Sequence, residues 1–415
     1  MEEKEGSARM SGLRRRKPNE EFNFKIAFCG SNSMIPDFGI KWYAIEFLDQ
    51  GSRPCYCPCR HCHCHCHGSS LARKKEKENV DISTYKKLIP YSSSSAKNSP
   101  NQVLTPFLVV EKDFAVDTRI LMDSHLYYFY GLSVWTLNFN SNSLDWKPAP
   151  SMNVSRSGAR HFTLDGKLYM LGGLEGQSVP PTHGWMEFFD PIIQKWEPLP
   201  NPPSTTMRSA TMICTVLKSK SQKEILVIDD FGKFYIYNLR TQCWKTLQVK
   251  PRQSRPLSQY KYKRPATVGN TLYWASLDRP HYRYGMCIVQ AYNVDTDVWF
   301  EGFFNTNQLF KKPEFLCNDE NLFPLIHVAD QKFCLLLESC TMHKNRGRPP
   351  EFDTKYVNFL VLDIHVPDDD DDEYDDDDDD YEPVYHKLSV SIVSIQKHIL
   401  GEDHRCFGLW DAVLL

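Results

Sequence analysis

The sequence predicts an all-β protein, namely a six-bladed β-propeller of four-stranded antiparallel blades closed by a C-terminal strand. Three observations predict this fold. An aromatic residue followed by Asn or Asp, with Trp six positions later, recurs at a period near fifty residues. A pair of strand-like segments precedes these copies. Aromatic residues make up 13% of the chain and prolines number 26, which favours short strands and tight turns over long helices.

The recurring motif has four clear copies in one register. They are Phe139-Asn140 to Trp146, Phe189-Asp190 to Trp196, Tyr237-Asn238 to Trp244 and Tyr292-Asn293 to Trp299. We expect the aromatic residue to end one strand, and the Asx side chain to turn the chain by bonding nearby backbone. The tryptophan then opens the next strand as a large apolar plug. Each copy is therefore predicted to be a β-hairpin.

A second hairpin lies upstream of each motif and is clearest in the third unit. There, Arg160–Leu164 and Lys167–Gly173 flank Asp165-Gly166, a dipeptide typical of two-residue hairpin turns. Equivalent second strands are predicted at Leu126–Gly131, Ile225–Asp230, Thr271–Leu277 and Phe333–Ser339. Each unit then has four antiparallel strands, which make one propeller blade.

The chain ends are predicted to meet in one blade. Lys25–Gly30 looks like a second strand with no first strand before it, and Leu409–Leu415 can supply the missing strand. Such sharing would remove exposed sheet edges. The predicted organisation is a disordered basic N-terminus at 1–21 and a propeller at 22–415. Two disordered insertions, at 50–80 and 367–383, interrupt the propeller.

The third unit resembles the kelch repeat. The resemblance rests on Asp165-Gly166-Lys167-Leu168-Tyr169, Gly172-Gly173, Trp185, Phe189-Asp190 and Lys195-Trp196. Other units keep the aromatic, Asx and Trp spacing but lose the diglycine, for example at Tyr130-Gly131. The chain is therefore identified as a member of the plant galactose oxidase/kelch-repeat superfamily, from about Phe22 to the C-terminus. This resemblance implies a propeller that binds a protein or peptide ligand.

Many plant relatives join kelch blades to an N-terminal F-box, a helical module that docks onto a ubiquitin-ligase scaffold. Residues 1–24 are polar and too short for that module. We therefore expect a non-catalytic protein-interaction module, such as an adaptor or substrate-recognition protein. A ubiquitin-ligase substrate receptor lacking its F-box is an alternative.

A Cys/His-rich run supports another alternative, a metal-dependent protein or enzyme. Ten such residues lie between Cys55 and His67, and thiolates and imidazoles bind zinc or copper. The candidate ligands are Cys55, Cys57, Cys59, Cys62, Cys64 and Cys66. Near-strict alternation favours no particular tetrahedral set, so a low-complexity loop that binds metal adventitiously remains the simpler interpretation. We expect no cofactor, and no catalytic motif is recognisable elsewhere. The eight scattered cysteines are expected to be reduced and buried.

The charges are segregated along the chain. Asp368–Glu382 carries thirteen acidic residues, and outside it 49 basic residues stand against 39 acidic ones. The acidic run is expected to be solvated, or to contact a basic partner. We also expect it to lie beside the basic segment around Arg73-Lys74-Lys75 and to pair with it. Arg14–Lys17 could serve in nuclear import, whereas Arg346-Gly347-Arg348-Pro349 resembles an AT-hook core too short to predict nucleic-acid binding.

A partner-binding face is predicted at one mouth of the central channel. Its candidate residues are Arg156, Arg160, Arg208, Arg264, His281, Tyr282, Arg283 and Tyr284. Arginines at the start of innermost strands could contact a ligand, and the aromatic-basic loop is suited to an interaction hot spot. The alternative is a structural role in which each arginine pairs with a neighbouring blade.

No secretory signal or membrane-spanning segment is recognisable. We therefore expect the protein in the cytoplasm, the nucleus or both, without a membrane partner. We also expect it to be a monomer.

Overall fold

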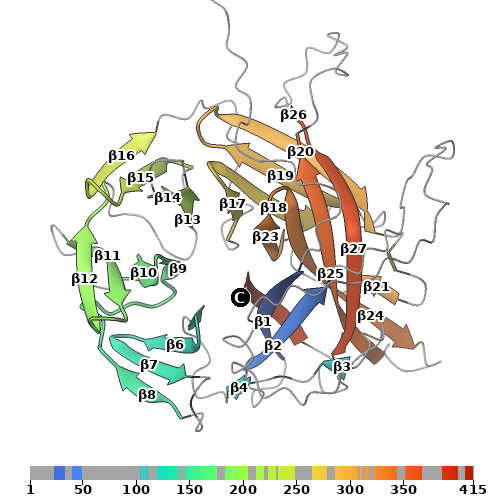
Figure 1. Ribbon diagram of the computed structural model, residues 1–415, viewed down its shortest axis with the longest axis horizontal. Helices are drawn as coiled ribbons and strands as arrows, with labels where there is room; N and C mark the ends of the chain where they lie inside the picture. Colours follow the sequence, from blue (N-terminus) through green and yellow to red (C-terminus); the bar gives the residue numbers. More distant parts are fainter. Residues whose placement is uncertain are drawn as a thin grey trace, which may run out of the picture.

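The computed structural model describes residues 23–32, 40–48, 103–104, 106, 108–110, 119–138, 141, 145–174, 183–203, 212–218, 223–229, 232–247, 264–277, 286–306, 309–310, 314–316, 322–343, 351–366, 386–400 and 407–414. Their strands form six sheets placed around a common centre (Figure 1). The all-β prediction is confirmed, as are the four-stranded antiparallel blades in a propeller arrangement. Within these residues, no helix has the length and apolar character needed to cross a bilayer.

Four of the described sheets have four strands each. From the centre outward, sheet 1 contains β28 (Phe407–Leu414), β1 (Asn23–Asn32), β2 (Ile40–Leu48) and β4 (Leu108–Val110). In the same direction, sheet 2 contains β5 (Arg119–Met122), β6 (His125–Tyr130), β7 (Ser133–Asn138) and β8 (Lys147–Ala149). Sheet 3 contains β9 (Arg160–Leu164), β10 (Lys167–Leu171), β11 (His183–Asp190) and β12 (Lys195–Pro200). Sheet 4 contains β13 (Ile213–Lys218), β14 (Lys223–Ile228), β15 (Phe234–Asn238) and β16 (Cys243–Leu247).

The other two described sheets carry additional short strands. Sheet 5 contains β17 (Ala266–Val268), β18 (Thr271–Leu277), β19 (Met286–Asn293), β20 (Val298–Asn305) and β26 (His386–Lys387), and β22 (Leu322–Phe323) also pairs with β18. Sheet 6 contains β21 (Glu314–Leu316) and β23 (Leu325–Ala329) beside β24 (Lys332–His343), followed by β25 (Glu351–His365), β27 (Ser389–Leu400) and β3 (Val103–Leu104).

Apolar clusters lie between neighbouring sheets and hold them together. In β14, Ile225 and Val227 pack toward sheet 3, whereas Leu226 and Ile228 pack toward sheet 5. A strand that is buried on both faces reads as a continuous apolar run, which explains Ile225–Ile228. Further clusters join sheets 1 and 2, 2 and 3, 5 and 6, and 6 and 1.

The outer hairpins have the predicted turn chemistry. Asn238 Oδ1 accepts hydrogen bonds from the backbone N–H groups of Arg240 (3.0 Å) and Thr241 (2.9 Å). Four positions after the Asx residue the chain adopts a positive φ, 54° at Gln242. Tyr237 then lies directly opposite Trp244 across the hairpin. Asp190 and Asn293 make the equivalent turns, so the predicted Asx turn is confirmed in three of the four copies. Phe139 and Asn140 of the first copy lie outside the described residues.

Each outer tryptophan of sheets 3 and 4 also bonds to the sheet before its own. The indole Nε1 of Trp196 donates to the carbonyl of Pro150, and that of Trp244 donates to the carbonyl of Pro200, both at 2.8 Å. A buried indole N–H needs such a partner. The repeated tryptophan therefore joins neighbouring sheets by packing and by a directional bond.

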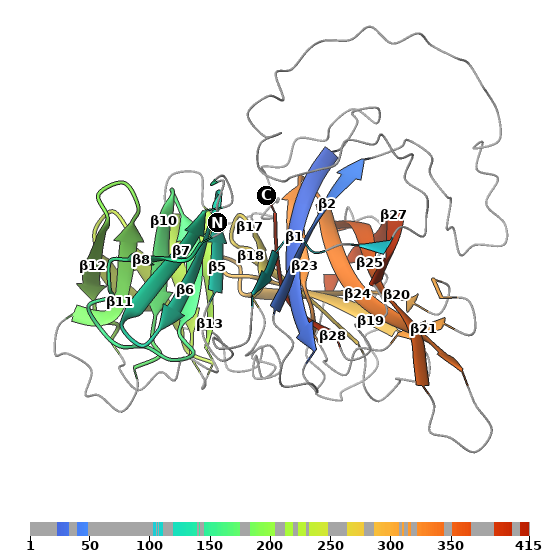
Figure 2. The ribbon, with the colours of Figure 1, turned by 90° about the horizontal axis from the view of Figure 1, so that it is seen from below.

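The C-terminal strand β28 pairs with β1, the first described strand of the chain (Figure 2). The two run antiparallel, with Ala27 opposite Val413 and Phe28 opposite Ala412. β28 also lies beside β23 of sheet 6, and sheets 6 and 1 share an apolar cluster. The count of six blades and the closure of a ring by this strand stay predictions.

Two short parallel strands attach neighbouring sheets at their outer edges (Figure 1). β3, which precedes β4 of sheet 1, pairs with β27 of sheet 6. β26, which precedes β27 of sheet 6, pairs with β20 of sheet 5. The sequence predicted neither strand. In the sequence, β3 follows the predicted insertion at 50–80, and β26 follows the one at 367–383.

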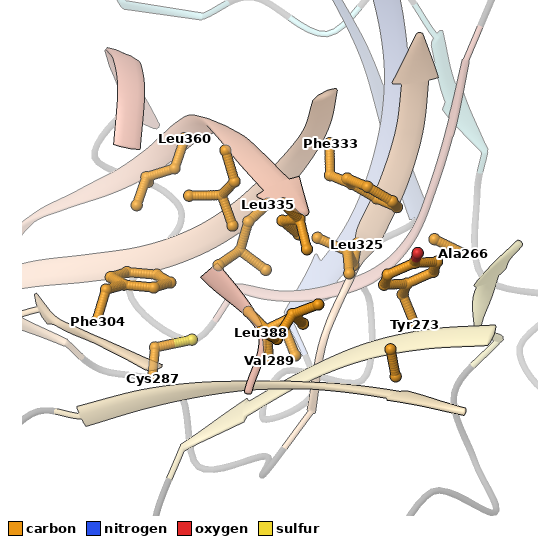
Figure 3. Packing of buried hydrophobic residues seen from close by; sticks show 14 of the residues in the cluster. Ala266, Tyr273, Cys287, Val289, Phe304, Leu325, Phe333, Leu335, Leu360 and Leu388 are labelled. Carbon is orange, nitrogen blue, oxygen red and sulfur yellow. The ribbon is translucent and has the colours of Figure 1, made fainter. Parts of the chain in front are cut away.

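The return segment beside β26 is packed tightly against sheet 5. Leu388 donates its backbone N–H to the carbonyl of Glu301 (2.8 Å), and its side chain is buried among those of sheets 5 and 6 (Figure 3). A Cβ at Gly302 would lie 2.2 Å from the carbonyl oxygen of Leu388. Glycine at position 302 therefore permits this close crossing.

Candidate interaction face

The topology separates two faces of the propeller. One, called the link face, carries the turns between second and third strands and the connections from each sheet to the next. Among described residues it includes Gly131-Leu132, 151–159, Gly172-Gly173, Asp229, Gly232-Lys233 and Arg264. The opposite face, called the hairpin face, carries turns such as Asp165-Gly166 and 191–194. Both predicted insertions leave their sheets on the hairpin face, whereas Arg156, Arg160 and Arg264, the predicted binding residues that the structure describes, belong to the link face.

Arg156 lies between sheets 2 and 3 and is 3% exposed. Its Nε donates to Glu187 Oε1 at 3.0 Å, and Glu187 is fully buried. Its Nη1 donates to the carbonyls of Gly172 (2.5 Å) and Trp185 (2.9 Å), and its Nη2 donates to that of Gly184 (2.6 Å). Arg156 therefore has the structural role that the sequence left open, and its guanidinium is not presented to a partner.

The diglycine of sheet 3 makes room for this arginine. Gly172 and Gly173 have φ values of 64° and 69°, a region that favours glycine. A Cβ at Gly173 would lie 2.8 Å from the carbonyl oxygen of Ser157 and 2.9 Å from the Cα of Ala159. The chain around Arg156 can approach sheet 3 this closely only because Gly173 has no side chain.

Arg160 and Arg264 occupy a different position, at the beginning of innermost strands. Arg160 opens β9 and donates from Nε to the carbonyl of Met212, which precedes β13 (3.0 Å). Arg264 precedes β17 and donates from Nη2 to the carbonyl of His161 (2.8 Å). Arg264 thus reaches from sheet 5 to sheet 3, past the beginning of β13. These two predicted residues come together at one mouth of the channel.

The positive charge of both arginines acts on His161. The pKa of this imidazole is lowered to about 3, mainly by burial and then by the charges of Arg264 and Arg160, in that order. The ring is therefore neutral near pH 7. The same two cations favour ionisation of Cys214 on β13, but burial is the larger effect and raises its pKa. Arg160 and Arg264 therefore place positive charge beside His161 and Cys214 at this mouth.

Large apolar side chains are also exposed on or near the link face. Tyr130, at the end of β6, is 65% exposed, and Leu132 in the following turn is 46% exposed. Neither residue was among the predicted binding residues. The sequence did contain a sign that Tyr130 is exposed. Tyr130-Gly131 occupies the position of the diglycine in the third unit, so a large aromatic residue replaces a glycine at a surface turn.

The remaining predicted site residues lie outside the described residues. They are Arg208, His281, Tyr282, Arg283, Tyr284 and the candidate metal ligands Cys55, Cys57, Cys59, Cys62, Cys64 and Cys66. The acidic run and the basic clusters at Arg14–Lys17, Arg73–Lys75 and Arg346–Arg348 lie outside them too. Within the described ranges, no group of three His, Cys, Asp or Glu side chains could hold a metal ion.

The described cysteines have the chemistry of structural thiols. Burial raises the pKa of Cys287 and of Cys334, which keeps both protonated and unreactive. All six described cysteines are free of disulfides, and five are buried. Cys243 differs from the expectation of burial: it is exposed, and its Sγ donates to the carbonyl of Thr241.

Comparison with known proteins finds similarity to F-box/kelch-repeat proteins of a plant. A putative F-box/kelch-repeat protein of Arabidopsis thaliana is 28% identical over 128 residues, covering 31% of this chain and 30% of that protein. An F-box/kelch-repeat protein of the same plant is 34% identical over 134 residues, with the same coverage. A third is 52% identical over 56 residues, or 14% of each chain. The first two matches thus span about a third of each relative. No family model matches the chain.

Proposed function

Because this chain is a relative of the plant F-box/kelch-repeat proteins and folds as a β-propeller, we propose that it is a protein-interaction module that binds its partner on the link face. The predicted kelch-repeat relationship is thereby confirmed. The observation that carries the proposal is the difference in exposure among side chains of the link face. Arg156 is fully engaged inside the fold, whereas Arg264, Tyr130 and Leu132 are exposed.

The proposed architecture is a ring of six blades in which β28 completes the sheet begun by β1. Two observations support it: the six described sheets, and the apolar clusters that join each sheet to the next, including sheet 6 to sheet 1. A rigid ring holds its surface loops in fixed positions and so presents a preorganised binding surface. Such a surface needs no catalytic group, which agrees with a non-catalytic adaptor or substrate-recognition role.

The test is affinity purification with the full chain as bait. Tyr130→Ala combined with Arg264→Ala should reduce the recovery of a specific partner at least tenfold, because exposed aromatic and arginine residues dominate interface energies. The matched control combines Ile192→Ala with Arg240→Ala. Ile192 and Arg240 are exposed residues in turns of the hairpin face. Equal recovery of every partner by both variants would rule out the link face as the binding surface.

A second candidate function is substrate recognition for a ubiquitin ligase. It is favoured by the relatives, which are named F-box/kelch-repeat proteins. Under this candidate, the propeller would present a substrate while an F-box in the same or another chain contacts the ligase. Co-purification of a ligase scaffold with the full chain, together with ubiquitination of a captured partner, would support it.

The metal-dependent alternative depends on the Cys/His run. Metal analysis of protein purified under reducing conditions tests it directly. Stoichiometric zinc or copper that is lost when the six clustered cysteines are replaced by serine would favour this alternative over a purely protein-binding role.

A further inference from the structure

The outer edges of the described sheets are protected in different ways. In sheets 5 and 6 a short parallel strand covers the long outer strand, β26 on β20 and β3 on β27. In sheets 2 and 3 the outermost strands contain prolines, which donate no backbone hydrogen bond: Pro148 in β8, and Pro198 and Pro200 in β12. Sheet 1 ends in β4, which has three residues. Short strands, prolines and covering segments all keep a sheet edge from pairing with another chain.

Sheet 4 lacks these features in the part of the chain that the structure describes. Its outermost strand β16 has five residues, and no described strand pairs with its outer side (Figure 1). Three of its residues, Cys243, Lys245 and Thr246, are exposed. Among the described outer strands longer than three residues, β16 therefore differs in having neither a proline nor a covering strand.

The repeated tryptophan indicates which backbone groups of β16 point outward. Thr246 stands two positions after Trp244, as Glu301 stands two positions after Trp299 in sheet 5. The carbonyl of Glu301 points outward, because it accepts the backbone N–H of Leu388 in the covering segment (2.8 Å). Both backbone groups of a strand residue point to the same side, and the side alternates along the strand. We therefore expect the N–H and C=O of Thr246 to point outward.

The prolines of sheets 2 and 3 occur at the same position of the repeat. Pro148 stands two positions after Trp146, and Pro198 stands two positions after Trp196. Proline is tolerated there because an outward N–H is not used by the neighbouring strand. At this position two sheets have proline and sheet 5 has a covering strand, whereas sheet 4 has Thr246, which retains its N–H group.

We propose that β16 is a strand-addition site, at which an extended segment of a partner protein pairs parallel to Cys243–Leu247 as a fifth strand of sheet 4. This surface lies at the rim of the propeller and is separate from the link face. Parallel pairing follows the two covering strands that the fold already contains. In strand addition the backbone hydrogen bonds supply affinity, and the alternating side chains supply specificity.

Lys245 indicates the charge of the occupant. It is exposed in the middle of β16. In sheet 5, Lys387 of the covering strand is in register with Glu301, a residue of opposite charge. An acidic residue opposite Lys245 would be favoured in the same way, whereas like charges opposite each other destabilise a strand pair. A second copy of this chain is therefore a poor occupant, because two-fold pairing centred on β16 would bring Lys245 opposite Lys245.

The test measures binding of a fluorescein-labelled heptapeptide, made of threonine and valine with one central glutamate, to the full chain by fluorescence anisotropy. Thr246→Pro should weaken binding at least tenfold, because it removes the outward N–H group. Thr246→Ala is the matched control, since it retains this N–H, and it should change binding less than twofold. Proline occupies the same position in sheets 2 and 3, so Thr246→Pro should fold, and a melting curve like that of the unsubstituted chain checks this.

A charge exchange tests the occupant with a second variant that keeps every backbone N–H. Lys245→Glu should weaken binding of the glutamate peptide about fivefold, and should strengthen binding of a peptide with lysine in its place by about the same factor. Equal binding of both peptides by both chains would overturn the assignment of an acidic occupant.

Three further results would overturn the proposal. The first is no saturable binding of the glutamate peptide by the unsubstituted chain. The second is equal binding by Thr246→Pro and Thr246→Ala. The third is a dimer of the unsubstituted chain, seen by sedimentation equilibrium, that Thr246→Pro dissociates, since the edge would then bind a second copy. The Tyr130→Ala, Arg264→Ala variant should bind the peptide with unchanged affinity, and weaker binding would contradict a site separate from the link face.

Discussion

Replacing Arg156 with methionine should destabilise the fold without acting through a partner. The substitution removes a buried cation and four hydrogen bonds, one to Glu187 and three to backbone carbonyls. Glu187 then remains fully buried, with only the backbone N–H and the side-chain amide of Asn153 as donors. Breaking a buried ion pair from one side costs about 3–5 kcal/mol. We therefore expect the free energy of unfolding to fall by about 4 kcal/mol.

Urea unfolding followed by tryptophan fluorescence measures this change. Arg264→Met is the matched control: it removes an exposed arginine and should change stability by less than about 1 kcal/mol. The double variant Arg156→Met, Glu187→Leu should regain part of the loss, because no buried charge is left without its partner. If Arg156→Met costs less than about 1 kcal/mol and instead abolishes partner recovery, Arg156 is a binding residue and the reasoning is refuted.

Three further predictions concern other parts of the fold. Gly302→Ala should lower the free energy of unfolding by about 2 kcal/mol, because its Cβ would collide with the carbonyl oxygen of Leu388. An unchanged urea-unfolding curve would contradict the close crossing. His398 has no hydrogen-bond partner in the described structure, and burial lowers its pKa to about 4. Between about pH 6.5 and about pH 4 the unfolded chain binds a proton at this position and the folded chain does not. The free energy of unfolding should therefore fall by up to about 3 kcal/mol as the pH is lowered through this range. The His398→Phe variant should show a smaller fall between pH 7 and pH 4.5. Deletion of 407–415 removes β28 and should lower the melting temperature of the whole propeller; an unchanged melting curve would argue against closure of the ring.

Local chemistry explains why the outer hairpins could be predicted. An Asx residue turns the chain with its own side chain, so Asn238 and Asp190 determine the turn whatever surrounds them. The Asp165-Gly166 turn is equally local, since both residues adopt positive φ values. The spacing between Tyr237 and Trp244 then follows from the pairing of the two strands.

The functional residues were harder to predict because their roles depend on distant partners. Arg156 and Arg264 occur in similar sequence contexts, yet one is buried and the other is exposed. The difference arises from Glu187, which is 31 residues away from Arg156 in the chain. No pattern near either arginine indicates which one meets a buried carboxylate. The parallel strands β3 and β26 were not predicted, because a strand of two residues is too short to show an alternation of apolar and polar residues.

The pairing of β1 with β28 also has a consequence for synthesis of the chain. β1 leaves the ribosome early, whereas its central partner follows roughly 375 residues later, which at about 5–20 residues per second is a delay of roughly 20–75 s. Until then the inner edge of the β1–β2 hairpin has unsatisfied backbone groups and the apolar side chains of Ile26 and Phe28. A chain that lacks β28 should therefore be prone to aggregate through this unpaired strand edge.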